Sequence, residues 1–190
     1  MSEIELYSGE YLDLERPDPR RINLDDIAVG LSREHRYAGQ SRLPYTVAEH
    51  ACLVQRRVRD EGGTALDQLA ALHHDDSEAL IKDVPAPLKR LLPEYRAVET
   101  RVMAAILTAL GLDGLGVDDE IVHDADMWAR AQEAHELMPS RGVGVHWDLE
   151  YVWDGKWRRL GQVDADDARV RWLATHYLLM AMSGLRNVEV

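Results

Sequence analysis

The sequence predicts an all-α protein, and three observations support this prediction. Apolar residues recur every three or four positions along most of the 190 residues, which is the spacing of one helix face. Residues typical of helix starts and ends bound these stretches. No internal repeat or low-complexity linker divides the chain, and a chain of this length buries a sizeable core as one unit. We therefore expect a single helical domain over residues 1–190.

The N-terminal arm is the least regular part of the prediction. Residues 1–22 contain two prolines and a glycine and show no sustained period, so we expect a loop or a short strand that lies over the core. Asn23 is then suited to cap a first helix over residues 24–34.

The next helix has the clearest start. Thr46 and Glu49 have the spacing of a capping box, and apolar residues follow at helical spacing until Gly62 and Gly63 end the helix. A third helix is expected over residues 65–74. Its core candidates are Leu66, Leu69, Ala70 and Leu72.

Two short helical pieces and two long helices are predicted in the middle of the chain. The short ones cover residues 77–81 and 89–92, because the prolines between them favour extended or turn geometry. Residues 93–110 form the strongest amphipathic helix, and its apolar stripe consists of Val98, Val102, Met103, Ile106, Leu107 and Leu110. The second long helix extends from Asp118 to about Met138, where a proline ends it.

Residues 140–163 differ from the rest of the chain. They hold four glycines and three of the five tryptophans, which predicts an irregular insertion or a small hairpin. A last helix over residues 164–182 completes the predicted bundle.

The composition limits the classes of function. With 34 acidic residues against 22 basic ones, the net charge is −12, which disfavours a surface that follows nucleic-acid phosphates. No apolar run approaches the roughly 18 residues of a membrane span, and the N-terminus has no secretory signal. The single cysteine, Cys52, excludes an internal disulfide. We expect a cytoplasmic protein, a homo-oligomer, that acts on a small molecule and binds neither nucleic acid nor membranes.

Four side chains from three helices form a candidate metal site. His74 and Asp75 follow an apolar helix, where a carboxylate is costly unless it is paired or binds a metal. His50 lies one turn inside the capped helix, and Asp126 lies beside an apolar helix face. Two imidazoles and two carboxylates suit one divalent transition metal, whether Co, Mn, Zn, Fe or Ni, with open positions for water and substrate. Alone, a His-Asp pair more often caps a helix and a mid-helix Asp more often faces solvent, so the prediction depends on the set.

A family resemblance rests on four stretches of the sequence. They are Tyr45-Thr-Val-Ala-Glu-His50, Leu72-His-His74-Asp75-Asp-Ser-Glu78-Ala, Lys82-Asp83-Val-Pro85-Ala-Pro87-Leu-Lys89 and His123-Asp-Ala-Asp126. In this order they resemble the HD-domain metal-dependent phosphohydrolases, above all the small 5′-deoxynucleotidases and the phage dATP triphosphohydrolases. The segment from Asp25 to Gly39 resembles the one that leads to the first histidine in these enzymes, and the likeness extends over about residues 5–138.

The resemblance implies three groups of site residues. The metal ligands would be His50, His74, Asp75 and Asp126. The catalytic acids would be Glu78, which positions or activates the attacking water, and Asp83, which transfers a proton. The substrate contacts would be Arg36 and Lys89 to phosphate and Tyr37 beside the sugar. A further Mg²⁺ ion could accompany a triphosphate substrate.

Two features depart from the family pattern. Asp76 replaces a small residue and is expected to add negative charge near the metal, whereas its neighbour His73 is expected to face elsewhere. Residues 140–163 have no counterpart in the family, and base specificity could lie there.

The resulting functional prediction is hydrolysis of deoxynucleoside 5′-phosphates. The products would be phosphate from a dNMP, or intact triphosphate from a dNTP such as dATP. Two alternatives stay open: a regulatory module that binds nucleotides without turnover, and a hydrolase of guanosine alarmones or cyclic dinucleotides. A phage-encoded enzyme would act in the cytoplasm of its host.

Overall fold

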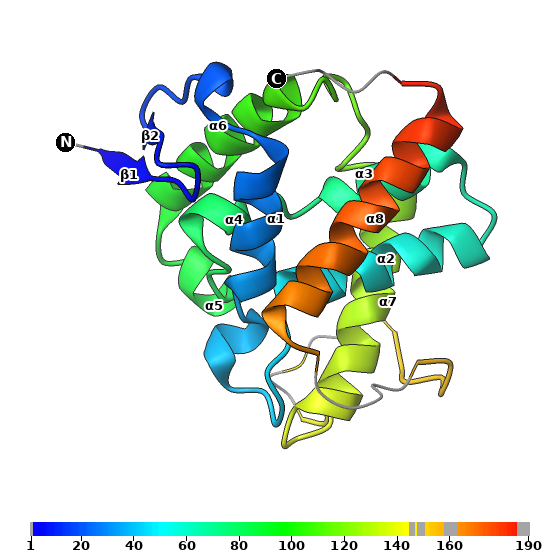
Figure 1. Ribbon diagram of the computed structural model, residues 1–190. Helices are drawn as coiled ribbons and strands as arrows, with labels where there is room; N and C mark the ends of the chain where they lie inside the picture. The colour runs from blue at the N-terminus through cyan, green and yellow to red at the C-terminus, as the bar shows by residue number, and fades with distance from the viewer. Residues whose placement is uncertain (1, 145–146, 148–150, 158–162, 186–190) are drawn as a thin grey trace.

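The structure, a computed structural model, describes residues 2–144, 147, 151–157 and 163–185. It is predominantly helical, which confirms the all-α prediction (Figure 1). The helices are α1 (Leu24–Arg33), α2 (Val47–Asp60), α3 (Ala65–His73), α4 (Glu78–Ile81), α5 (Ala86–Lys89), α6 (Pro93–Ala109), α7 (Glu120–Leu137) and α8 (Ala165–Ser183). Two 3₁₀ turns cover Pro19–Arg21 and Arg36–Gly39.

The N-terminal arm forms a small antiparallel hairpin. Its strands are β1 (Glu3–Glu5) and β2 (Tyr11–Asp13), and Leu12 of β2 is fully buried in the main core. The predicted short strand over the core is thus confirmed, with a second strand paired to it.

Side-chain caps set where α1 and α2 begin, as predicted. Asn23 and Thr46 each accept a hydrogen bond from the backbone N–H three residues further on. The acidic side chain at that third position reaches back to the cap, which completes a capping box in both helices. Because α2 begins at Val47, His50 lies in its first turn, where it is fully buried.

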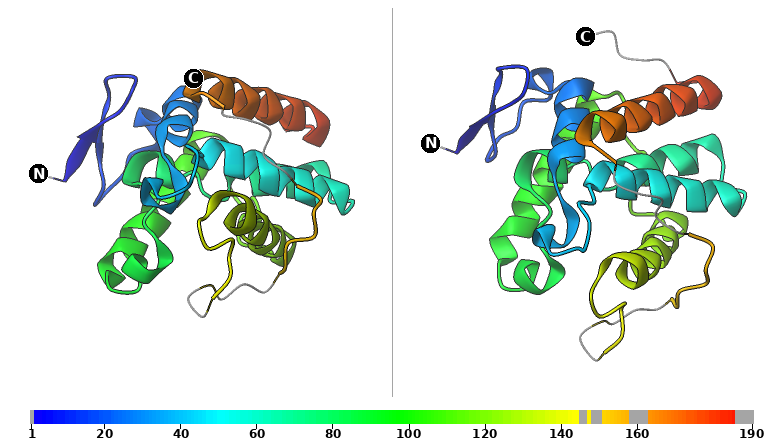
Figure 2. Two further views of the ribbon diagram at one scale, coloured as in Figure 1. Left: turned by 90° about the horizontal axis from the view of Figure 1, so that it is seen from below. Right: turned by 60° about the horizontal axis from the view of Figure 1, so that its bottom comes forward.

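Helices α2 and α3 form the middle layer of the bundle. Helix α8 packs on one side of them and α7 on the other (Figure 2). One core cluster includes Leu72, Ile106 and Trp172, from α3, α6 and α8. A second includes Val54 of α2 and Ala129 of α7. Helices α2 and α3 both pack on α7. The candidate site lies where the first turn of α2 and the C-terminal end of α3 face this helix.

Helix α1 crosses α4 at very close range. A Cβ atom added to Gly30 would lie 2.4 Å from the carbonyl oxygen of Ala79 and 2.7 Å from its Cβ. Only glycine fits this contact without movement of one helix. The contact fixes the position of α4, which begins with Glu78.

Two details of the helix prediction were wrong. The short turn predicted at residues 89–92 lies earlier, at α5, because proline is well tolerated in the first turn of a helix. Leu66 is 45% exposed, since it lies on the solvent side of α3. The predicted stripe of α6 faces the core: Val102, Ile106 and Leu110 are buried in it, Val98 and Leu107 pack against it half-buried, and Met103 is half-buried.

The described part of residues 140–163 packs against the bundle. Trp128 donates a hydrogen bond to Asp154 at 3.1 Å, and Trp157 contacts Tyr45 edge-on at 6.0 Å between ring centres. The described residues of this insertion form turns and bends without a strand, and the rest of the predicted hairpin lies outside them. Within the described ranges, no helix combines the length and the apolar character needed to cross a membrane.

Candidate metal centre

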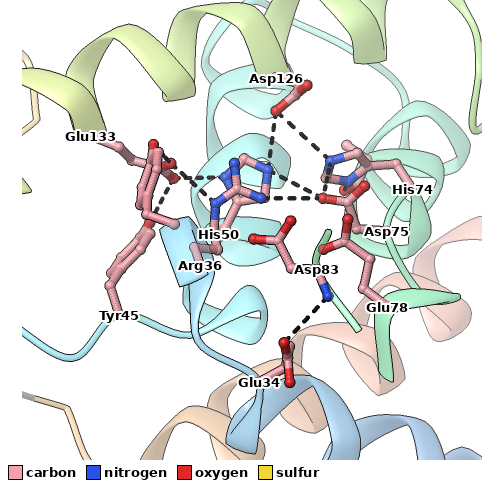
Figure 3. Close-up of polar contacts among 12 residues, drawn as sticks. Glu34, Arg36, Tyr45, His50, His74, Asp75, Glu78, Asp83, Asp126 and Glu133 are labelled. Atoms are coloured by element: carbon pink, nitrogen blue, oxygen red, sulfur yellow. Dashed lines mark hydrogen bonds and ion pairs between the residues drawn. The ribbon is translucent and has the colours of Figure 1, made fainter. Parts of the chain in front are cut away.

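The four predicted metal ligands face one another at the meeting point of α2, α3 and α7. The Nε2 atom of His50 lies 3.0 Å from an Asp126 oxygen and 3.5 Å from an Asp75 oxygen. The Nε2 atom of His74 lies 3.1 Å from the same Asp75 oxygen and 4.0 Å from the same Asp126 oxygen (Figure 3). Ligand atoms that each lie about 2.1 Å from one ion are about 3.0–3.4 Å apart at octahedral or tetrahedral angles. The spacing of these atoms suits a single ion.

The hydrogen bonds of the two imidazole rings use their Nδ1 atoms, and their Nε2 atoms face the two carboxylates. Nδ1 of His50 lies 2.6 Å from a Glu133 oxygen, and Nδ1 of His74 lies 2.8 Å from the carbonyl oxygen of Ala71. Because both partners only accept hydrogen bonds, each ring donates a hydrogen bond from Nδ1. Both Nε2 atoms are buried and make no hydrogen bond of good geometry. This is the arrangement that holds metal-ligating histidines in place.

The group His50, His74 and Asp75 could therefore hold a metal ion, because its ligand atoms all lie within 4.8 Å of one another. Asp126 faces the same point from α7. Burial acts to lower the pKa of His74, but Asp75 and Asp126 outweigh it and raise this pKa to about 10. The carboxylates thus stabilise positive charge at this point, and a divalent cation fits this requirement.

Glu133 is a site residue that sequence reasoning missed. It is fully buried, and it accepts hydrogen bonds from His50, from the hydroxyl groups of Tyr37 (2.7 Å) and Tyr45 (2.9 Å), and from Nε of Arg36 (3.3 Å). Burial acts to raise the pKa of Glu133, but His50 and Arg36 outweigh it and lower this pKa. The available signal was its spacing, since Glu133 lies two helical turns after Asp126 on the same face of α7.

Arg36 lies beside the centre, as predicted, whereas Tyr37 is engaged differently. Nη1 of Arg36 is 3.4 Å from Asp75, and its side chain is only 11% exposed. Tyr37 directs its hydroxyl group at Glu133, and its ring lies 6.1 Å from that of Trp147. Its backbone has a φ of 58°, in the left-handed region that bulky residues rarely adopt. Backbone strain of this kind persists where the surroundings enforce it, and it is concentrated at functional sites.

The two predicted catalytic acids also reach the centre (Figure 3). Glu78 is buried with one carboxylate oxygen unpartnered, and burial together with Asp75 raises its pKa well above the usual value. Burial likewise raises the pKa of Asp83, against the effect of Arg36. Asp83 follows a strained turn at Lys82 (φ 81°, ψ 150°), a conformation that is rare outside glycine.

Lys89 is close to these acids but is held by two carboxylates. Its Nζ atom lies 2.6 Å from Glu99 and 3.4 Å from Glu78. The structure therefore brings the four candidate ligands, both acids and Arg36 together. Lys89 contacts Glu78 of this group and is also paired with Glu99.

Two cavities lie near this part of the fold. One of about 440 Å³ adjoins His74 and Asp75 and is lined from α6 by Met103 and Leu107. The other, of about 540 Å³, lies between α2 and α8 and includes none of the predicted site residues. Of these two cavities, the first opens beside the candidate ligands.

Comparison with known proteins gives a family but no activity. No family model matches the chain. The uncharacterized protein YfdR of Escherichia coli (strain K12) is 40% identical over 137 residues, which are 72% of this chain and 73% of YfdR. An uncharacterized protein of Rhodobacter capsulatus is 36% identical over 112 residues, which are 56% of this chain and 57% of that protein. By the identity and the coverage of the first match, the chain belongs to the same family as YfdR.

Proposed function

We propose that this protein is a metal-dependent phosphohydrolase of the HD-domain type that acts on deoxynucleoside 5′-phosphates. One observation carries the proposal: four side chains with the donor set of a divalent metal lie close to a buried acid, a half-buried acid and a guanidinium group. The four side chains are His50, His74, Asp75 and Asp126. When bound there, a divalent cation would neutralise phosphate charge and make water more acidic.

The charge balance of the site supports a cation. Five carboxylates lie at or next to the centre, and among the residues that the structure describes the arginine and lysine side chains paired with them are those of Arg36 and Lys89. The five are Asp75, Glu78, Asp83, Asp126 and Glu133. A phosphate ester would be repelled by this many acids, so it requires positive charge beyond that of the two side chains.

Arg36 is suited to bind the phosphate group. A guanidinium group has five N–H donors, and Arg36 directs Nε to Glu133 and Nη1 to Asp75 at the long distances of 3.3 and 3.4 Å. The remaining donors can form a charge-assisted pair with phosphate oxygens. Glu133 and Asp75 meanwhile hold the guanidinium plane in one orientation.

Glu78 and Asp83 are suited to manage protons. Burial raises the pKa of both groups, so each can hold or release a proton closer to neutral pH than an ordinary carboxyl group. In the proposed mechanism Glu78 orients the attacking water and accepts its proton. Asp83, beside Arg36, delivers a proton to the leaving oxygen of the sugar.

The test is a product analysis with matched variants. Protein stripped of metal and reloaded with Mn²⁺, Co²⁺ or Zn²⁺ is incubated with each dNMP, each dNTP and the matching ribonucleotides. We expect deoxynucleoside together with either phosphate or intact triphosphate. Asp75→Ala should abolish both metal content and turnover, and Asp124→Ala, a change on α7 outside the centre, should preserve both. If nucleotide binds to the metal-loaded protein without turnover, the hydrolase proposal is wrong.

A further inference from the structure

A second, fully buried polar cluster lies directly behind the candidate ligands. Nδ1 of His73 lies 2.5 Å from Asp76, and its Nε2 lies 2.9 Å from Nδ1 of His176 on α8. His73 and Asp76 are 0% exposed, and His176 is 3% exposed. The segment His73 to Asp76 thus contains two His–Asp pairs: the outer pair faces the metal centre, and the inner pair faces α8.

The geometry identifies this cluster as a chain of hydrogen bonds. His73 uses nitrogen atoms on opposite edges of its ring for its two partners, so the three residues cannot all direct a ligand atom at one ion. Asp76 accepts from Nδ1–H of His73, which leaves Nε2 of His73 to accept from Nδ1–H of His176. Burial and the neighbouring His73 lower the pKa of His176 to about 3, so its ring is neutral at physiological pH.

Helix α8 holds the end of α3 at a second point. The indole N–H of Trp172 lies 3.3 Å from the carbonyl oxygen of Leu72. The indole ring stacks on His176 and meets His73 edge-on, with ring centres 5.9 Å and 5.0 Å apart. Trp172 thus contacts Leu72 and His73, the two residues that immediately precede His74.

A purely apolar contact would join α3 and α8 at a lower cost in free energy. Burial of two imidazoles and a carboxylate is unfavourable unless their hydrogen bonds are satisfied, and such networks specify one arrangement more than they add stability. In this cluster the network fixes the directions of two adjacent carboxylates, those of Asp75 and Asp76. Because His73 binds Asp76, that carboxylate is directed away from the centre and Asp75 alone enters it. Asp76 therefore does not direct its carboxylate at the candidate ligands, although its charge still acts on His74 and Asp75, and His73 faces elsewhere, as expected.

We propose, on the basis of the metal centre proposed above, that His73, Asp76 and His176 are positioning residues that align His74 and Asp75 for metal binding. His176 is the member that ties this alignment to α8. It contacts no ligand itself and acts through His73.

The test measures Co²⁺ affinity and the visible absorption spectrum of bound Co²⁺, together with the melting temperature of the metal-free protein. His176→Phe keeps the stacking on Trp172 and removes the hydrogen bond. We expect its Co²⁺ affinity to fall about 10–100-fold, as for other residues that orient metal ligands, and its spectrum to change. His176→Gln, which keeps a donor for His73, should recover most of both. If the phenylalanine variant does not fold, His176→Leu takes its place.

The matched control is another buried polar pair that joins two helices. Gln55 of α2 donates to Gln68 of α3 at 2.9 Å, away from the metal centre. Gln68→Leu should lower the melting temperature but leave Co²⁺ affinity and spectrum unchanged. The proposal is overturned if His176→Phe has the wild-type affinity and spectrum, or if Gln68→Leu changes them equally. Wild-type protein that binds no Co²⁺ would overturn the metal centre as well, whereas protein that binds Co²⁺ without turnover would contradict only the hydrolase function.

Discussion

Glu133 Oε1 lies 2.6 Å from Nδ1 of His50, on the edge of the ring opposite to Asp126, whose carboxylate is 3.0 Å from Nε2. Both acids come from α7, and they lie two turns apart on one face. Helix α7 therefore contacts both edges of the His50 ring. Glu133 accepts a hydrogen bond at one edge, and Asp126 is a candidate metal ligand at the other. This arrangement makes the contribution of each acid to metal affinity separately testable.

Glu133→Gln should weaken metal binding without removing a ligand. The amide cannot accept as strongly from His50, and its own donors face Tyr37 and Arg36, so the imidazole loses its fixed orientation. We expect metal affinity to fall about 10–100-fold. Titration against a chelator of known affinity measures the change. Glu136→Gln, on the same helix, is the control, and an equal loss there would contradict the role of Glu133.

Asp126→Ala should have a larger effect, because it removes a proposed ligand. Its oxygen lies near Nε2 of both His50 and His74, so its loss opens one side of the centre. We expect metal content after dialysis to fall below that of the Glu133→Gln protein. Elemental analysis of both proteins gives the comparison, with Asp124→Ala as the control. Full metal content in Asp126→Ala would show that the three residues of the closer group suffice.

The fold and the centre differ in how far the sequence predicts them. Helix starts such as those at Asn23 and Thr46 depend on local hydrogen bonds, so local patterns find them. The candidate metal ligands were predicted from the set and its order along the chain, because each of them alone more often has an ordinary structural role. Glu133 was missed because an acid late in a helix looks solvent-facing until the fold shows that it is buried. The partner of His73 lies 103 residues further along the chain, and no local pattern reveals such a pair.

Gly30→Ala should destabilise the protein, although alanine is the better helix former. The gain in helix propensity is at most about 1 kcal/mol. The new methyl group would meet the backbone oxygen of Ala79 at 2.4 Å, and overpacking of this kind costs about 1–3 kcal/mol or more. We expect the melting temperature to fall by roughly 2–8 °C. Ala79→Gly should restore only part of the loss, because the carbonyl oxygen remains; an unchanged melting temperature for Gly30→Ala would show that α4 can move.

His176 should make stability depend on pH. Burial and the neighbouring His73 lower the pKa of His176 from 6.5 to about 3, so the unfolded chain takes up this proton first as the pH falls. The stabilisation is complete above about pH 6.5 and decreases below it, by at most about 1.4 kcal/mol per pH unit. Urea unfolding of metal-free protein between pH 7 and 5 measures this slope. His176→Gln carries every other titrating group, so its free energy of unfolding should fall less steeply than that of the wild type. Parallel curves for the two proteins would mean that His176 takes up its proton equally in the folded and unfolded states.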